Sequence, residues 1–500
     1  MKTKLFPFAA IAFVMAACSS EDVIETNPDP KGDALSFSIA VGHSRAVETE
    51  LGNLGNFAVV AKGVHPHGSV YDSFLIGGAG GTDAGSIGGI TAKKAGNDNW
   101  TFDNSVYWPA SINDVLFWAY TCSQKTVKDD GTSNISDVLP SGAYYQFEGN
   151  DAWIKNFSPE EAVLTENRSD GVWADGFFQK DLLGAFKQAK RTDGSVVTLN
   201  FKHMLSQISI KASSKLKADT DHRIVRIKGA WIVNTQDKAN LKSGYSWSDG
   251  TAADNAAWTD FGVKDDNDDN DDNDDNNNKK FTAYGSFYKK PLILDDDKDN
   301  LDLLNDGGSL MLIPQTIKAW DKKTTSWDAD AAEKKNAYIL LLCRVELKHK
   351  GDTHPSNPGD TDIDDIVVSN GYHYHQQFPV NASSKFNEGE YGFVCVPVGT
   401  TFEMGKKYTF NLDICGKDSG AGNYPPDGDG YDYSSLYPAG HSFASQLGAA
   451  NDVALTVVSR PTAKNVGDVV LDGAIEFNVK IEPWAAADAD WKDGDLTFSK

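Results

Sequence analysis

The sequence predicts an all-β protein made of two tandem β-sandwich domains with long loops. Short runs of residues alternate between apolar and polar, which is the period of a strand with one buried face. Turn-forming residues, including 45 glycines, separate these runs. No long stretch has helical periodicity, and the only helix candidates are short, at Phe178–Gln188 and Phe443–Ala449. A chain of 500 residues is long enough for two or three domains.

The N-terminus has the pattern of a bacterial export signal. Lys2 and Lys4 precede an apolar run from Leu5 to Ala17, too short for a membrane span. Small residues stand directly before Cys18, as in a lipobox. We therefore expect residues 1–17 to be a lipoprotein signal peptide and Cys18 to be the lipidated mature N-terminus. A plain signal peptide with a coincidental cysteine is the alternative.

Residues 18–45 are expected to form a tether followed by one strand. The tether, Asn27–Gly32, is rich in turn formers. In the strand, Leu35, Phe37, Ile39 and Val41 alternate with small or polar residues. If these four side chains fill a core groove, excising the strand would forfeit about 6–12 kcal/mol of burial. That rivals the stability of a whole domain, so the excised protein would seek a replacement strand from another subunit.

The hydrophobic register changes within Ser195–Lys211. Val197, Leu199 and Phe201 alternate with polar residues, whereas after His203 the apolar residues are Ile208 and Ile210. A straight strand cannot change register in this way, so a bulge or turn is expected at 203–206. Either the strand crosses between two sheets of one sandwich or it joins two β domains. His203 is expected to be a core histidine, and we place the N-terminal domain at 46–213 and the C-terminal domain at 214–500.

The C-terminal half contains further strand candidates and one low-complexity segment. The strand candidates are Ile224–Val233, Leu310–Pro314, Ala337–Leu347, Tyr391–Val398, Lys407–Ile414, Asp452–Val458 and Ile475–Ile481. The segment 264–280 repeats aspartate and asparagine with period three. Its carboxylates suit calcium, but it lacks the glycine and closing glutamate of an EF-hand, so a solvated acidic loop is the preferred interpretation.

Composition and motifs argue against several functional classes. The 47 Lys and Arg against 71 Asp and Glu give a net charge of −24, which disfavours nucleic-acid binding. We find no nucleophile elbow, zinc-protease helix motif or phosphate-binding loop, so no enzyme, cofactor or metal is expected. His65-Pro-His67 and His373-Tyr-His375 lack a companion ligand. The cysteines Cys122, Cys343, Cys395 and Cys415 could form disulfides in an export compartment, but the sequence does not reveal their pairing.

Three motifs, in this order along the chain, resemble the fimbrillin-like family of type V pilins and related surface lipoproteins of Bacteroidales-type bacteria. They are Tyr107-Trp-Pro109 with Phe117–Tyr120, Phe201-x-His203-x-Leu-Ser-Gln-Ile208, and Met311-Leu-Ile-Pro-Gln-Thr316. The resemblance implies transthyretin-like domains and a surface-exposed outer-membrane location through the lipid on Cys18. It also implies cleavage by an arginine-specific protease between Arg45 and Ala46, and donor-strand assembly with other pilin subunits into a pilus.

Two functions follow as alternatives. The first is a structural or tip subunit of a type V pilus that is cut after Arg45 and supports adhesion. In stalk pilins of the family the C-terminal strands supply the donor, whereas here Leu496 and Phe498 alternate only briefly after Trp484. The second is an outer-surface lipoprotein that keeps its first strand, because Arg45 is an uncut loop residue, and binds glycan or another surface protein.

Overall fold

The computed structural model confirms the all-β class. It describes residues 34–41, 56–66, 68–78, 89–96, 99–124, 126–127, 133–134, 139–140, 142–148, 151–159, 172–174, 179–214, 222–243, 245–248, 251–261, 281–295, 300–304, 310–321, 336–350, 366–369, 372–380, 386–426, 433–437, 442–444 and 452–484. Within these ranges the helical elements are two 3₁₀ turns, Arg191–Asp193 and Tyr433–Leu436. No helix of the described part is long and apolar enough to cross a membrane.

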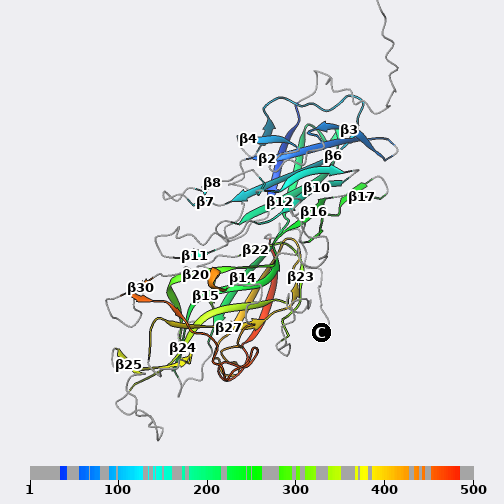
Figure 1. Ribbon diagram of the computed structural model, residues 1–500. Coiled ribbons are helices and arrows are strands. Elements are labelled where there is room, and N and C mark those ends of the chain that lie inside the picture. Colours follow the sequence, from blue (N-terminus) through cyan, green and yellow to red (C-terminus); the bar gives the residue numbers. More distant parts are fainter. Residues whose placement is uncertain are drawn as a thin grey trace, which may run out of the picture.

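The strands form an N-terminal and a C-terminal lobe (Figure 1). In the N-terminal lobe a sheet runs in the order β3-β2-β4-β5-β1-β13-β12-β6, and a further pairing of β2 with β6 closes it into a ring. Its strands are β1 (Ser36–Val41), β2 (Asn56–Val64), β3 (Val70–Ile76), β4 (Ile90–Gly96), β5 (Asn99–Phe102), β6 (Asp114–Gln124), β12 (Lys180–Lys190) and β13 (Val196–His203).

A second sheet, in the order β19-β16-β10-β9, packs on the outside of this ring. Its strands are β9 (Tyr144–Glu148), β10 (Asp151–Phe157), β16 (Ala239–Ser243) and β19 (Ala257–Thr259). Tyr145, Phe147 and Leu241 from this sheet join Val60 and Trp118 from the ring in one apolar cluster. The lobe therefore has two cores, one inside the ring and one between the ring and the second sheet.

The C-terminal lobe is a sandwich of an eight-stranded and a five-stranded sheet. One contains β11 (Val172–Ala174), β20 (Phe281–Leu294), β15 (His222–Gln236), β24 (Tyr338–Lys350), β26 (Tyr372–Phe378), β25 (Ile366–Ser369), β27 (Glu390–Pro397) and β32 (Thr456–Val457). The other contains β21 (Leu301–Asp302), β14 (Ser206–Ser213), β22 (Leu310–Leu312), β29 (Lys406–Asp413) and β33 (Glu476–Pro483). The largest apolar cluster of the described residues lies between them.

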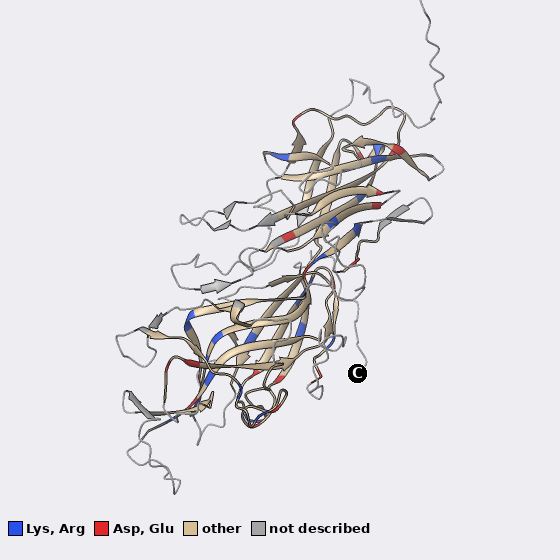
Figure 2. Ribbon diagram, viewed as in Figure 1, with Lys and Arg blue, Asp and Glu red and all other residues tan. Residues whose placement is uncertain are grey.

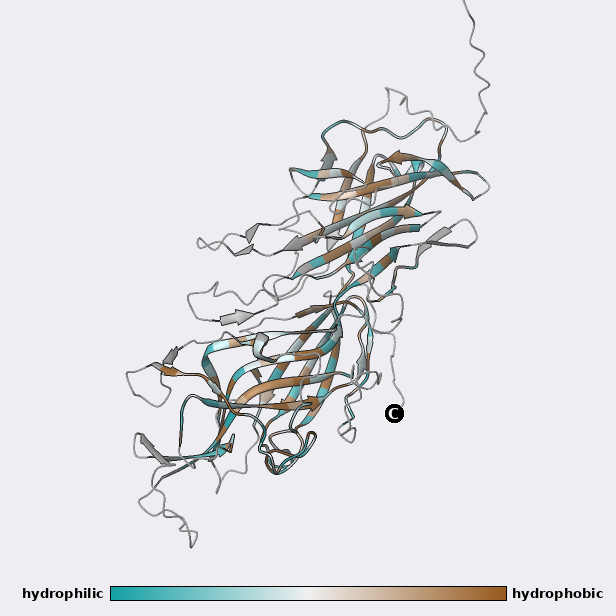
Figure 3. Ribbon diagram, in the orientation of Figure 1, coloured by the Kyte–Doolittle hydropathy of each residue, from teal (hydrophilic) through white to brown (hydrophobic). Residues whose placement is uncertain are grey.

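Four two-stranded pairs complete the described strands. They are β7 (Thr126–Val127) with β8 (Ser133–Asn134), β17 (Tyr245–Ser248) with β18 (Thr251–Asp254), β23 (Thr316–Ile317) with β28 (Thr400–Thr401), and β30 (Ser442–Ala444) with β31 (Asp452–Ala454). In the described part, Lys, Arg, Asp and Glu are interspersed over both lobes (Figure 2). Hydrophobic residues concentrate along the strands of both lobes (Figure 3).

The predicted break at 203–206 is the passage between the lobes. β13 ends at His203 in the ring, and β14 begins at Ser206 in a sheet of the C-terminal lobe. Of the two expected solutions, the strand joins two β units rather than two sheets of one sandwich. The chain also returns, because β16 and β19 follow β15 in sequence yet pair in the N-terminal lobe. The expected domain bounds, 46–213 and 214–500, stay a prediction.

The helix expected at Phe178–Gln188 is wrong, because residues 180–188 belong to the long strand β12. Leu183 and Ala185 face the core inside the ring, whereas Leu182 and Phe186 face the outer apolar cluster. A strand that is buried on both faces loses its period-two pattern. The second helix candidate is wrong at its start, where Ser442–Ala444 form strand β30, and its residues 445–449 lie outside the described ranges.

Candidate functional site

The first strand, β1, is an interior strand of the ring. It pairs in parallel with β13 from Ser36↔Val196 to Val41↔Phe201. On its other edge it pairs antiparallel with β5 at Phe37↔Trp100. The backbone N–H of Leu35 donates to Val106 O at 2.7 Å, and that of Ser36 donates to Ser195 O at 2.9 Å. β1 therefore closes the gap between β5 and β13.

The apolar side chains of β1 fill the centre of the ring. Leu35, Phe37 and Ile39 are buried in the cluster inside it. Phe37 is fully buried and meets three rings edge-on, with centroid distances of 5.9 Å to Phe57, 5.4 Å to Phe102 and 5.9 Å to Phe117. Their quadrupoles favour this T-shaped arrangement. The alternation predicted from the sequence is thus a true core face.

Removal of β1 would expose a slot one strand wide. β5 and β13 would each lose a partner and present unpaired backbone groups. Burial of Leu35, Phe37 and Ile39 contributes about 1.5–3 kcal/mol per side chain, so their loss removes about 5–9 kcal/mol. This is comparable to the net stability of a domain. The opened ring would have a strong tendency to recruit another strand.

The other sequence-predicted site residues lie outside the described ranges. Cys18, Arg45 and Ala46 fall there, as does the acidic segment 264–280. Val41 belongs to β1 and stands opposite Phe201, but its side chain is not described. Lipidation at Cys18 and cleavage after Arg45 therefore stay predictions.

His203 forms a contact between the lobes, and the sequence predicts its burial but not its partners. His203 is a buried core histidine, as expected, and its Nδ1 lies 3.1 Å from Oδ1 of the buried Asp181. Its ring stacks on Trp484, which follows β33 and is itself buried. The sequence patterns predict neither the burial of Trp484 nor the contact of His203 with Asp181. A hydrophobic residue directly after a clean strand pattern was the one available signal for Trp484.

The predicted roles of the aromatic and cysteine residues can also be placed. Trp108 and Trp118 are core residues, as expected, and Trp108 Nε1 donates to Ile112 O at 2.7 Å. Cys343 and Cys395 are buried strand residues, as predicted, and the four described cysteines, Cys122, Cys343, Cys395 and Cys415, are free thiols. Burial raises the pKa of the Cys415 thiol to about 12, so it is protonated near neutral pH. Among the described residues no group of three His, Cys, Asp or Glu side chains could hold a metal ion.

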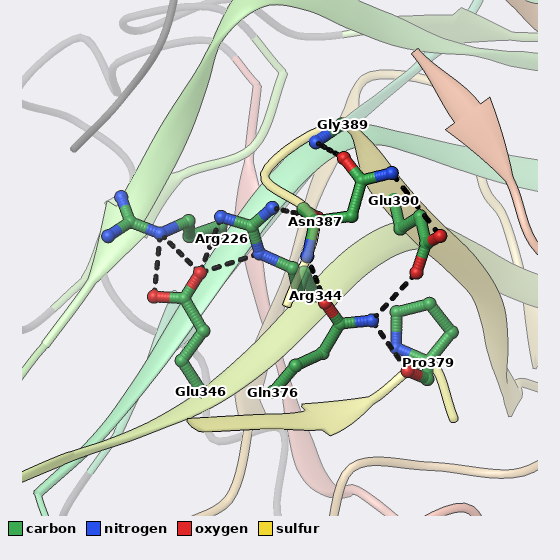
Figure 4. A network of polar contacts seen from close by, with 8 residues as sticks. All are labelled: Arg226, Arg344, Glu346, Gln376, Pro379, Asn387, Gly389 and Glu390. Atoms are coloured by element: carbon green, nitrogen blue, oxygen red, sulfur yellow. Dashed lines mark hydrogen bonds and ion pairs between the residues drawn. The ribbon is translucent and has the colours of Figure 1, made fainter. Parts of the chain in front are cut away.

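A buried charge cluster occupies the outer face of the β15–β24 pair (Figure 4). Arg226 and Arg344 stand directly opposite each other on the two strands, and Glu346 lies two residues from Arg344. Arg226 Nε donates to both carboxylate oxygens of Glu346 at 2.9 Å, and Arg344 Nε donates to Oε1 at 2.6 Å. All three side chains are at most 3 % exposed. One carboxylate thus neutralises part of two buried guanidinium charges.

The same cluster fixes a neighbouring loop. Arg344 Nη1 donates to Asn387 O at 3.0 Å, and Asn387 Nδ2 donates to Glu390 at 3.3 Å. Gln376 Nε2 donates to Pro379 O at 2.8 Å and to Glu390 at 3.2 Å (Figure 4). Pro379 lines a hollow of about 260 Å³ whose walls carry aromatic, proline and valine side chains together with Ser459 and Arg460. These contacts connect Asn387 to the charge cluster through Arg344 and to Gln376 through Glu390.

Comparison with known protein families gives a match over most of the sequence. The sequence pattern of a family described as fimbrillin-like matches residues 76–421. No protein with a curated description matches the sequence. Among solved structures, a fimbrial protein from Bacteroides vulgatus is similar at 14% identity and a TM-score of 0.41, covering 90% of this chain and 99% of its own.

Two further solved structures are candidate cell adhesion proteins. The one from Bacteroides uniformis has 13% identity and a TM-score of 0.30, and the match covers 92% of this chain and 100% of its own. The one from Bacteroides eggerthii has 11% identity and a TM-score of 0.31, covering 92% and 98%. These similarities are low, and the family assignment depends on the match over residues 76–421.

Proposed function

The chain belongs to the fimbrillin-like family, and from this premise we propose that it is a structural or tip subunit of a type V pilus that supports adhesion. In this proposal the chain is exported as a lipoprotein on Cys18, is exposed at the outer membrane, and is cut by an arginine-specific protease after Arg45. Assembly with other pilin subunits then follows by exchange of β1.

The position of β1 is the observation that carries the proposal. β1 completes the ring and contributes two core side chains, Phe37 and Ile39, next to that of the preceding Leu35, yet it is the first strand of the described chain. Excision of β1 would leave the other strands of the ring hydrogen-bonded in one sheet, because β2 also pairs with β6. The protein would keep a nearly complete ring with one slot, bordered by β5 and β13.

A strand from another subunit fits such a slot by β-augmentation. Main-chain hydrogen bonds to β13 and β5 would supply affinity, and alternate apolar side chains would supply specificity. The donor needs large apolar residues at the three alternate positions that Leu35, Phe37 and Ile39 occupy. Cleavage would thereby convert a lipid-tethered monomer into a subunit able to polymerise.

A second candidate function is an uncut outer-surface lipoprotein that binds glycan or another surface protein. The observation that favours it is that the ring is complete with β1 in place, because β1 pairs with a neighbour on each edge, β5 and β13. In this case β1 is a permanent part of the core and Arg45 has no processing role.

N-terminal mass spectrometry on protein from the surface of native cells separates the two functions. The pilin function predicts an N-terminus at Ala46, and the Arg45→Ala variant should stay monomeric and lipidated. Arg168→Ala is the matched control, because it removes another arginine and should still mature to Ala46. A lipidated Cys18 on all of the wild-type protein, or heat-labile polymers formed by Arg45→Ala, would contradict the proposed maturation.

A further inference from the structure

Strand β33 forms one margin of the β21-β14-β29-β33 sheet and is drawn in red in Figure 1. In the described part of the chain, β33 pairs with β29 alone. This pairing runs without a bulge from Lys406↔Pro483 to Asp413↔Glu476. The other edge of β33 is therefore long and regular, and such an edge is a template for a further strand.

The backbone groups of β33 alternate in direction. The Trp484 N–H donates to Gly405 O at 2.7 Å, on the β29 side. In an antiparallel pair every second residue directs its N–H and C=O to the same neighbour. Asn478 therefore turns these groups to β29, whereas Phe477 and Val479 turn theirs to the outer edge. This edge offers donors and acceptors at the spacing that an antiparallel strand requires.

The apolar side chains of β33 lie on the core face of the sheet. Phe477 stands opposite the buried Leu412, and its ring lies 6.4 Å from that of the buried Phe410. Phe477 is nevertheless 37% exposed, and Ile481 is 54% exposed. The core of the C-terminal lobe thus stays open to solvent along this edge. A strand added beside β33 would cover these side chains.

The other face of β33 is polar and carries charges of both signs. Lys480 Nζ donates to Glu482 Oε1 on the same strand at 2.6 Å. Glu476 instead stands opposite Asp413 of β29. Like charges directly opposite each other destabilise a sheet, so a cation on the outer side of Glu476 would offset this repulsion.

A second copy of β33 can supply that cation in one register. Two antiparallel copies related by a two-fold axis perpendicular to the sheet keep their core faces together only when one residue stands opposite itself. With Asn478 on the axis, Glu476 stands opposite Lys480 of the second copy at both ends. With Val479 on the axis, Glu476 would meet Glu482, and with Lys480 on the axis two lysines would meet. Of these three registers, the one centred on Asn478 brings opposite charges together.

We propose that two copies of the chain pair through β33 into a symmetric dimer, which joins their five-stranded sheets into one. Phe477 of each copy packs beside Val479 of the other, and backbone hydrogen bonds join the same two residues. Glu476 forms an ion pair with Lys480 of the other copy at each end. The contact is small, so the pair is weak and the chain is monomeric in dilute solution. β1 lies in a different sheet, so this pairing needs no cleavage at Arg45 and is separate from the proposed maturation.

Sedimentation velocity of the uncut chain over a wide range of concentration tests the dimer. The sample is residues 19–500 with Arg45→Ala, which lacks the lipidation site and keeps β1. We expect a monomer at low concentration and a rising dimer fraction at high concentration. Glu476→Lys and Lys480→Glu should each weaken dimerisation by at least about tenfold, because each turns two cross-strand attractions into repulsions. The double variant Glu476→Lys/Lys480→Glu should restore it, since opposite charges face each other again.

A matched control separates this contact from a general effect of charge. Lys93→Glu reverses an exposed lysine on β4 of the N-terminal lobe and should dimerise like the parent chain. Circular dichroism checks that each variant is folded. If a charge reversal unfolds the chain, Lys480→Gln takes its place and must also weaken dimerisation.

A cross-link tests the register. Asn478 stands opposite itself in a pair whose backbone groups turn away from each other, and the Cα atoms of such pairs lie about 4.5 Å apart. This distance falls within the range of disulfides, about 4.4–6.8 Å. Asn478→Cys should therefore give a covalent dimer on mild oxidation, whereas Lys480→Cys, opposite Glu476, should not. The described native cysteines are buried and do not compete.

Several outcomes would overturn the proposal. A monomer at every concentration would do so, as would undiminished dimerisation of both single charge variants. Stronger dimerisation of Glu476→Lys would indicate the register centred on Val479, and equal cross-linking of Lys480→Cys would contradict the register as well. Dimerisation only after removal of residues 485–500 would mean that the chain's own C-terminal segment occupies the edge, which also contradicts the proposed dimer.

Discussion

The rings of His203 and Trp484 stack face to face, with centroids 4.1 Å apart and planes inclined by 7°. His203 ends β13 in the N-terminal lobe, and Trp484 follows β33 in the C-terminal lobe. The Trp484 backbone N–H also donates to Gly405 O at 2.7 Å. This contact joins the end of the described chain to the passage between the lobes.

We expect Trp484→Ala to lower the free energy of unfolding by about 3–5 kcal/mol, the usual cost of deleting a buried tryptophan ring. The ring is only 2% exposed, so little relaxation can fill its place. Urea denaturation followed by circular dichroism measures the change. Ile481→Ala is the control, because Ile481 lies nearby on β33 but is 54% exposed. A loss as small as that of the control would mean that the stacked pair does not stabilise the junction.

The core role of β1 predicts a second difference in stability. Phe37→Ala should cost about 3–5 kcal/mol, because it removes a fully buried ring that three other rings contact. Ser38→Ala on the same strand should cost about 0.5–1.5 kcal/mol, since its Oγ forms one exposed hydrogen bond with Thr198 at 2.9 Å. Both values come from denaturant titration of the uncut protein. Equal effects would show that β1 is not held by its apolar face.

Sequence patterns identified the parts of the fold that have one buried face. β1 and β13 follow from the alternation of apolar and polar residues, as in Leu35 to Ile39. In the C-terminal sandwich the sequence predicts β15, β24, β27, β29 and β33 but does not predict β20 or β26. The pattern of β12 predicts a helix instead of a strand, because Leu182 and Leu183 are neighbours in sequence and are buried on opposite faces. β33 shows the opposite failure, since Phe477 and Ile481 alternate cleanly yet are exposed at the edge of the sheet.

The candidate sites were less accessible to sequence reasoning for a related reason. The buried charge cluster joins Arg226 to Arg344 and Glu346, which are far away in sequence and become its neighbours only through the pairing of β15 with β24. The partner of His203, Asp181, lies across a pairing of β12 with β13 that covers two residue pairs. No local sequence pattern encodes the register between two distant strands. The first strand and the proposed cleavage site after Arg45 are contiguous in the sequence, so both could be proposed from it.

The buried charge cluster predicts a large effect of a small substitution. Glu346→Gln should lower stability by about 3–5 kcal/mol, because it leaves two opposed guanidinium groups buried without a carboxylate. Glu482→Gln is the matched control. Glu482 pairs with Lys480 at the surface, and exposed pairs contribute about 0–1 kcal/mol. If Glu346→Gln unfolds at the same urea concentration as the control, the two buried guanidinium groups do not depend on the Glu346 carboxylate for their charge balance.

The described thiols predict a pattern of chemical reactivity. Burial raises the pKa of Cys343 well above its usual range and that of Cys415 to about 12, and the reactive form is the thiolate. Native protein treated with iodoacetamide at mildly alkaline pH should therefore acquire no adduct on Cys122, Cys343, Cys395 or Cys415. The same treatment in denaturant should label all four, as peptide mass spectrometry would show. If two of these cysteines stay unlabelled in denaturant without reductant, a disulfide joins them. That outcome would contradict the free-thiol state.

Lys228 predicts a pH dependence of stability. It lies beside the charge cluster, where burial first and the Arg344 charge second lower its pKa to about 7. Its Nζ donates to Lys289 O at 2.6 Å and lies 5.6 Å from the centroid of the Tyr391 ring. Between pH 7 and the ordinary lysine value of 10.5, the unfolded chain holds a proton that the folded chain lacks. The contribution of Lys228 to stability must therefore rise with pH above 7, by at most about 1.4 kcal/mol per pH unit.

The Lys228→Met variant isolates this contribution. At pH 6 the variant should be more stable than the wild type, because it avoids a buried ammonium group close to the Arg344 guanidinium. That advantage should shrink steadily from pH 7 to pH 9, where the wild-type amine is neutral in the folded state. Lys480→Met, at an exposed position of β33, should show a nearly constant difference over the same range. A pH-independent difference for Lys228→Met would mean that the amine keeps its ordinary pKa in the folded protein.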